Sequence, residues 1–197
     1  MSLKSLNKID KLLKKPLFSA AEARKLGVHP SVLAYYCNKG VLERVSRGFY
    51  RLAENNLKTP FEWQDVALVT SSIPNGVICL TTALIYYELT DEFAREIWIA
   101  VPRESRPPKR PNTRIVRFSN MSLGVSKVSF GEVSVKMFNR ERTIIDSFRY
   151  LSKEIAIKAL KGYLKNNKER KPDLKKLSKY AKTLRVDISP YIETVLT

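Results

Sequence analysis

Few residues of this chain have the types and spacing that catalysis requires. His29 is the only histidine among 197 residues, which excludes a His-rich metal site and disfavours a triad built on a histidine base. Cys37 and Cys79 lie far apart without the spacing of metal ligands, so we expect a reduced, cytoplasmic chain. The sequence contains no glycine-rich phosphate loop. We therefore expect no cofactor, no bound metal and no enzymatic activity.

One acidic cluster leaves an enzymatic alternative open. It consists of Asp91, Glu92 and Glu96. In a nuclease, carboxylates of this kind hold a divalent metal that activates water. Glu96 directly precedes a predicted strand, but the spacing of the three residues matches no convincing metal site. A metal-dependent nuclease is therefore the least favoured interpretation.

Basic side chains offer another chemistry, the binding of polyanions. The chain carries 36 Lys and Arg against 19 Asp and Glu, a formal net charge of +17. Residues 1–55 contain eleven of the basic and four of the acidic residues, a local charge of +7, and residues 150–197 also reach +7. Such a charge favours nucleic acid as a partner, through contacts with phosphate and the release of counterions. The competing interpretation is a surface that only keeps the protein in solution.

Helix signals accompany the N-terminal charges. Apolar residues recur with helical spacing at Leu3, Leu6, Ile9 and Leu13. Pro16 is expected to end this first helix. Ser19 and Glu22 have the spacing of a capping box, which predicts a second helix over residues 20–26. Gly27 suits the left-handed position beyond that helix.

A third helix and a hairpin complete the pattern of a winged helix-turn-helix. Pro30 suits the first turn of the third helix, with His29 in the cap position and Gly40 at its end. Strand-forming residues flank residues 46–48, which predicts a hairpin with its glycine in the turn. In this fold class the third helix enters a major groove, and the hairpin lies along the backbone or reaches into a minor groove. We expect residues 1–57 to form this DNA-binding domain.

The third helix and the hairpin supply the candidate contacts to double-stranded DNA. Leu33, Tyr36 and Cys37 share one helix face, which is expected in the core. Tyr35 is expected to be exposed, where its ring and hydroxyl can contact sugar, phosphate or a base edge. The guanidinium of Arg47 suits the negative potential of a minor groove. The predicted DNA-binding residues are Ser31, Tyr35, Asn38, Lys39, Arg44, Ser46, Arg47, Gly48 and Arg51.

Structural alternatives exist for this site. Arg44 and Arg51 could form ion pairs within the chain instead of contacting phosphate. The neighbouring carboxylates are those of Glu43 and Glu54. Winged helices can also serve as protein-interaction modules, and basic residues on a small domain often face only solvent.

The remaining chain predicts a second domain of α+β class over residues 59–197, with a small antiparallel sheet and C-terminal helices. Strand patterns occur at residues 96–102, 114–118, 125–130 and 133–138. Helical patterns occur at residues 61–76, 79–89, 139–150, 152–167, 172–184 and from Ser189 onward. Thr81 or Thr82 is the expected cap of the helix over residues 79–89. A basic, proline-containing loop at residues 103–114 should be extended and exposed.

The lysines of the last helices lie opposite their apolar faces. They form either a solvated face or an auxiliary surface for phosphate or a partner. No stretch approaches 18 apolar residues, so we expect no membrane span. The N-terminus lacks the apolar region of a signal peptide.

Arg142 and Asp146 lie four residues apart on a predicted helix, where their side chains can form a salt bridge. With Thr143 they form the motif Arg-Thr-x-x-Asp, to which we assign a structural role. Asp146 has neither a second carboxylate nor a histidine at a useful spacing, so it does not form an acid–base pair.

Several segments together resemble one family of bacterial regulators. In chain order they are FSAAEARKLGV, GVLERVSRGFYRL, CLTTALIYYEL and RERTIIDSF. The same order is found in AbiEi-type antitoxins, which are winged-helix regulators of abortive-infection, type IV toxin–antitoxin systems in phage defence. The resemblance covers most of the chain. By this resemblance, Arg47 and Gly48 match the wing tip, and Ser31, Tyr35 and Asn38 match the outward positions of the recognition helix.

The resemblance implies a function for each domain. The N-terminal domain would bind inverted repeats in the promoter of its own two-gene operon and repress it. The C-terminal domain would counter a nucleotidyltransferase-like toxin, without forming a stable complex with it. His29 and Pro30 stand where relatives often have small polar or basic residues, so the base contacts can differ here.

A second interpretation keeps the DNA binding without the antitoxin role. The chain would then be an ordinary winged-helix regulator whose C-terminal domain senses a ligand or dimerises. The sequence leaves the operator and the oligomeric state open.

Overall fold

The computed structural model describes residues 8–15, 17–53, 61–93, 95–131, 133–165 and 171–196. The chain divides into two compact units. The first contains Met1–Pro74 and Ser129–Val135, and the second contains Asn75–Val128 and Lys136–Thr197. The predicted domain boundary near residues 57–59 lies outside the described residues. The overall class is α+β, as expected from the sequence.

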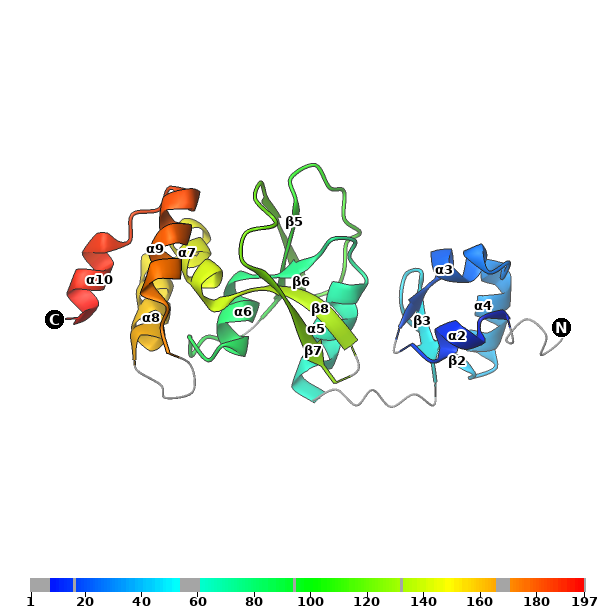
Figure 1. The fold of residues 1–197 in the computed structure, drawn as a ribbon. Helices are drawn as coiled ribbons and strands as arrows, with labels where there is room; N and C mark the ends of the chain where they lie inside the picture. Colours follow the sequence, from blue (N-terminus) through cyan, green and yellow to red (C-terminus); the bar gives the residue numbers. More distant parts are fainter. Residues whose placement is uncertain are drawn as a thin grey trace. The chain divides into compact units, whose positions relative to one another are not determined.

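The first unit contains short helices and a small sheet (Figure 1). Its elements are α2 (Asp10–Leu13), β1 (Phe18–Ser19), α3 (Ala20–Lys25), α4 (Pro30–Asn38), β2 (Leu42–Ser46), β3 (Phe49–Leu52) and α5 (Phe61–Ser71). The sheet is antiparallel with the strand order β1-β3-β2. Strand β1 was missed by the sequence patterns, because two residues are too short to show alternation.

Local signals account for the helices of this unit. The hydroxyl of Ser19 accepts from the Glu22 amide at 3.1 Å, and the Glu22 carboxylate accepts from the Ser19 amide at 2.8 Å. The predicted capping box is thus confirmed. Gly27 follows α3 with a φ of +75°, the left-handed conformation that was expected there. Of the first predicted helix, Leu3, Leu6 and Pro16 lie outside the described residues.

The core of the N-terminal part is formed by residues from every element between α2 and β3. Buried members include Ile9, Phe18, Leu33, Tyr36 and Tyr50. The rings of Phe18 and Tyr50 lie on paired strands with their centroids 6.1 Å apart. Burial of these side chains fixes α4 against the hairpin, because each one removes apolar area from water.

The second unit is built around a mixed sheet with helices (Figure 1). Its elements are β4 (Val77–Ile78), α6 (Leu80–Tyr86), β5 (Ile97–Pro102), β6 (Thr113–Phe118), β7 (Val125–Phe130), β8 (Val133–Phe138), α7 (Arg140–Tyr150), α8 (Lys153–Leu164), α9 (Leu174–Leu184) and α10 (Ser189–Leu196). The ends of β7 and β8, residues 129–135, are grouped with the first unit. The strand order is β6-β5-β4-β8-β7.

The expectation of a small antiparallel sheet was wrong. The sheet has five strands, and two of its pairs, β5 with β6 and β4 with β8, are parallel. A parallel pair needs a connection that returns along the strand, over about 20 Å for six residues. The basic loop at residues 103–112 makes this return, and ten extended residues can span about 33 Å. Its prolines favour the extended path that this crossover requires.

The helix over residues 79–89 is shorter than expected, and its cap was wrongly assigned. Helix α6 begins after Cys79, whose side chain makes no capping hydrogen bond. The hydroxyl of Thr82 instead accepts from the Trp98 amide at 2.9 Å, which joins α6 to β5. Strand β4 precedes the helix and was also missed.

Helices α7, α8 and α9 lie side by side and enclose a second core (Figure 1). Its buried residues include Ile144, Leu160, Tyr163, Leu177 and Ile188. Side-chain caps begin these helices, from Asn139, Ser152 and Asp173 respectively. In the part of the chain that the structure describes, no helix combines the length and apolarity needed to cross a membrane.

Candidate nucleic-acid interface

Helix α4 has a buried face and an exposed face. Leu33 is fully buried and Tyr36 is nearly so, and Cys37 is half-buried. Ser31, Asn38 and Lys39 are exposed. Pro30 and His29 start the helix as predicted, and the His29 ring accepts from the Ser31 amide through Nδ1 at 3.3 Å. The exposed face therefore carries three of the predicted DNA-binding residues.

Two details of α4 modify the predicted contacts. Tyr35 was expected to be exposed, but it is half-buried. Its ring packs edge-on against Tyr36 with centroids 5.3 Å apart, and the Lys39 ammonium lies 6.0 Å from its centroid. Tyr35 also packs against the buried core cluster that contains Tyr36, which explains its partial burial. The Ser31 hydroxyl lies 2.9 Å from His29 Nδ1, so the cap also orients this hydroxyl.

The hairpin after α4 is fixed by its turn. Gly48 has a φ of +80°, which favours glycine. A shift in register between Arg44 and Ser46 bends β2 just before the turn. The carbonyl of Gly48 accepts from the Ala20 amide at 2.8 Å, which ties the turn to the first residue of α3. The exposed side chain of Arg47 is thereby held at the end of the hairpin.

The three arginines of the hairpin differ in their surroundings. Arg51 pairs with Glu43 across β2 and β3, with Nη2 2.6 Å and Nε 2.7 Å from the same carboxylate oxygen. The ion pair considered as an alternative for Arg51 is thus present. Arg44 and Arg47 are exposed, and neither has an ion pair with any residue that the structure describes. Their charges remain open to an external anion.

Two exposed cations of the first unit were not among the predicted site residues. Arg24 and Lys25 lie in the last turn of α3 and are exposed. Basic residues favour the last turn of a helix because they interact with the carbonyl end of the dipole. The helix dipole alone explains basic residues at these two positions. The sequence pattern therefore did not mark Arg24 and Lys25 as DNA contacts.

The cysteines have little capacity for thiolate chemistry. Cys37 and Cys79 are both free thiols. Burial raises the pKa of the Cys37 thiol, although the nearby Arg44 opposes part of the rise. Burial raises the pKa of Cys79 far more strongly. Both groups therefore stay protonated near neutral pH.

The motif of Arg142, Thr143 and Asp146 lies in the core of the second unit. All three side chains are fully buried. Arg142 Nε lies 2.6 Å from an oxygen of Asp146, and Arg149 Nη1 lies 3.1 Å from the other oxygen. Burial raises the pKa of Asp146, while both guanidinium groups oppose this rise. Thr143 donates to the Phe138 carbonyl at 3.2 Å, which joins α7 to β8.

Arg142 also links the segments around α7. Its Nη1 donates to the Leu123 carbonyl at 3.2 Å. The guanidinium carbon lies 4.7 Å from the ring centroid of Phe138 and 5.6 Å from that of Phe118. A cation enclosed by two rings and one carboxylate connects sheet and helices. This geometry supports the structural role that we assign to the motif.

The acidic cluster does not form a metal site in the described part of the chain. Asp91 and Glu92 are exposed in the loop between α6 and β5. Glu96 Oε2 lies 3.7 Å from Nη1 of Arg114 on β6, so this carboxylate has an ion pair. Among the described residues, no group of three or more His, Cys, Asp or Glu side chains is arranged to hold a metal ion.

Comparison with known protein families gives a match for the N-terminal part. Residues 7–53 match the family model described as "Transcriptional regulator, AbiEi antitoxin". The match spans the helices, the hairpin and the candidate interface just described. Over these residues it confirms the resemblance to AbiEi-type antitoxins. No curated protein matches the chain.

Proposed function

We propose that this protein is a transcriptional repressor that binds DNA through a winged helix-turn-helix and autoregulates a toxin–antitoxin operon. The proposal rests on two features that occur together within residues 7–53, the family match and two exposed arginines. The family match covers a segment in which Arg44 and Arg47 are exposed without an ion pair to any described residue. Exposed, unpaired guanidinium groups are suited to phosphate and to a narrow minor groove.

In the proposed complex, α4 lies in the major groove. Ser31 and Asn38 would contact base edges or phosphate, and the half-buried Tyr35 would present its hydroxyl at the edge of the helix. Arg47 would enter the adjacent minor groove. Phosphate contacts would come from Lys39, Arg44, Ser46 and the Gly48 backbone, with Arg24 and Lys25 as additions. Arg51 would contribute less, because Glu43 pairs with its guanidinium.

The operator would contain inverted repeats in the protein's own promoter, as in the AbiEi resemblance. A full-length binding titration against that promoter tests this, with a shuffled fragment of equal length as the control. We expect tighter binding to the promoter and a steep fall in affinity with salt, because several phosphates are neutralised. Equal affinity for both fragments would contradict sequence-specific repression. Affinity that is flat between low and moderate salt would contradict the phosphate contacts.

We propose further that the protein acts in the cytoplasm as the antitoxin to a nucleotidyltransferase-like toxin, through its second unit and without a stable complex. A downstream reading frame of that class in the same operon would support this. Co-expression of the full chain with that toxin should restore growth. Failure to restore growth, with promoter binding intact, would favour an ordinary regulator instead.

A further inference from the structure

One aromatic side chain of the second unit is almost entirely exposed. Phe93 is 92% exposed, whereas the next most exposed large hydrophobic residue among those described, Leu174, is 47% exposed. Phe93 follows the exposed acidic residues Asp91 and Glu92 in the loop between α6 and β5. An exposed benzyl group costs free energy in water, and two adjacent carboxylates restrict the partners that can cover it.

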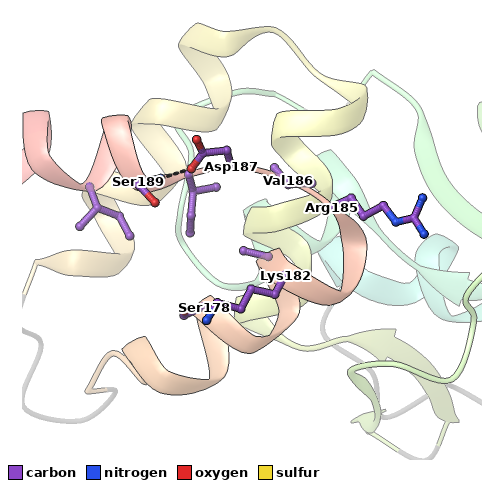
Figure 2. A pocket seen from close by; sticks show the side chains of 9 residues that line it. Ser178, Lys182, Arg185, Val186, Asp187 and Ser189 are labelled. Atoms are coloured by element: carbon purple, nitrogen blue, oxygen red, sulfur yellow. Dashed lines mark hydrogen bonds between the residues drawn. The ribbon is translucent and has the colours of Figure 1, made fainter.

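The same unit contains a groove of complementary character between α9 and α10. Its volume is about 430 Å³. Its apolar lining comes from Ala181, Val186, Ile188 and Ile192. Figure 2 shows Lys182 along α9 beside this hollow, with Asp187 and Ser189 on the turn into α10. Such a lining suits one apolar side chain with polar neighbours.

The shape of the groove follows from how α9 ends. Arg185 terminates the helix with a φ of +56°, a conformation that favours glycine. The amide of Val186 returns to the Ala181 carbonyl at 2.9 Å. Asp187 then accepts from the Ser189 amide at 3.0 Å and starts α10. The sharp turn places α10 beside the last turns of α9, and Arg185 extends outward from it (Figure 2).

The rim of the groove is strongly basic. Lys182 and Arg185 line it, and Lys175 and Lys179 line a second hollow of about 570 Å³ further along α9. None of these four cations has an ion pair with any of the described side chains. Asp187 is the single acidic residue in the two linings. The groove is therefore suited to an apolar group that carries negative charge beside it.

We propose that the Asp91-Glu92-Phe93 segment of one copy docks in the α9–α10 groove of a second copy. Phe93 covers the apolar lining, and the two carboxylates lie against Lys182 and Arg185. Phe93 does not occupy the groove of its own chain, because its side chain is exposed. Nucleic acid fits less well, since a phosphate backbone offers no apolar group for the lining. Both parts lie in the second unit, so the contact does not depend on DNA binding.

The contact is heterologous, because two different surfaces meet. Two copies can exchange segments and close into a dimer, or successive copies can form an open chain. The buried area is small, so we expect weak association that salt weakens further. A test must therefore capture short-lived complexes of the full-length protein.

Photocrosslinking from position 93 provides this test. A benzophenone amino acid replaces Phe93 in the full chain, and labelled and unlabelled copies are mixed before irradiation. We expect a crosslink between copies, mapped by mass spectrometry to residues 178–192. Crosslinks confined to one chain, or lying elsewhere on the second copy, would overturn the proposal. So would transfer of the crosslink to DNA when a duplex is added.

Charge reversal distinguishes a specific groove from general attraction. Lys182→Glu with Arg185→Glu should lower the crosslink yield at least about tenfold, because like charges then face each other. Lys153→Glu with Lys161→Glu is the matched control on α8, where both lysines are exposed. Equal losses in the two double variants would overturn the proposal.

A charge swap distinguishes the loss of this contact from a folding defect in the variants. Copies carrying Asp91→Lys and Glu92→Lys, with the crosslinker at position 93, are mixed with copies carrying Lys182→Glu and Arg185→Glu. We expect the yield to recover in this mixture alone, since the swapped charges attract again. Absence of recovery, with native circular dichroism for both variants, would contradict the assigned pairing.

Discussion

Gly124 and Arg142 approach each other so closely that no side chain fits at position 124. A Cβ atom on Gly124 would lie 2.7 Å from the Cβ of Arg142 and 3.0 Å from Asn139 Oδ1. The φ of Gly124 is +71°. Its carbonyl accepts from the Asn139 amide at 2.7 Å. The loop before β7 is thus clamped against the start of α7, beside the buried ion pair.

Gly124→Ala should therefore destabilise the protein by at least about 2 kcal/mol, through a steric clash and an unfavourable backbone conformation. Gly162→Ala is the control, because a Cβ there would make only ordinary contacts of 3.7 Å with Leu89. We expect that variant to gain up to about 1 kcal/mol, since alanine favours the helix. Chemical unfolding followed by circular dichroism measures both. Equal stability of the two variants would show that the clamp is not rigid.

Removing both partners of the buried Arg142–Asp146 pair should cost less than the sum of the two single losses. Asp146→Leu leaves the Arg142 guanidinium buried without its carboxylate, and Arg142→Met leaves the carboxylate with Arg149 alone. Each should lose about 3–5 kcal/mol of unfolding free energy. The double variant should lose clearly less than the sum, because no uncompensated charge remains between those two positions. Additive losses in urea unfolding would contradict a coupled pair.

Local signals in the sequence were sufficient for much of the fold. The capping box at Ser19, the start of α4 at Pro30 and four strands of the larger sheet were placed correctly. These features depend on neighbouring residues, whose chemistry is visible in sequence. Two-residue strands such as β1 and β4 carry no periodicity, so they were missed.

Long-range pairing could not be predicted in the same way. The parallel pairs of the sheet depend on the path of the loop at residues 103–112, and its composition indicates only that it is extended. Thr82 bonds to Trp98, sixteen residues away, where a local reading favoured a cap. At the interface, Tyr35 covers core that only the folded unit defines. Composition indicated a basic surface but did not distinguish the paired Arg51 from the unpaired Arg47.

Acid should weaken the capping of α3. Burial raises the pKa of Glu22, but hydrogen bonds from Lys15 and Ser19 outweigh this and leave the pKa below its usual value. A carboxyl group whose pKa is lower in the folded than in the unfolded protein stabilises the folded state at pH values above its unfolded pKa. This stabilisation is lost as the pH falls through the folded pKa. Glu22→Gln should therefore be less stable than the parent at pH 7, and the difference should shrink at pH 3. A thermal unfolding difference that is independent of pH would contradict the ionised cap.

Glu43→Gln should strengthen binding to the operator, if the proposed function holds. The substitution removes a negative charge from the hairpin and releases the Arg51 guanidinium from its 2.6 Å ion pair. We expect affinity to rise about two- to fivefold, with a steeper salt dependence, because one more cation can meet phosphate. Fluorescence anisotropy at several salt concentrations measures both. Unchanged affinity and slope would indicate that Arg51 serves only to hold the two strands together.

Arg47→Ala should reduce operator affinity at least about tenfold, close to 1.4 kcal/mol. Its guanidinium is exposed at a turn that the bond between Gly48 and Ala20 holds in place. Arg47→Lys should fall between alanine and the parent, because it keeps the charge but loses the planar fork of donors. Lys161→Ala, which removes one exposed charge from α8, should change affinity less than about twofold. Titration of each full-length variant against the promoter decides the matter, and equal losses for Arg47→Ala and Lys161→Ala would assign the effect to total charge rather than to the hairpin.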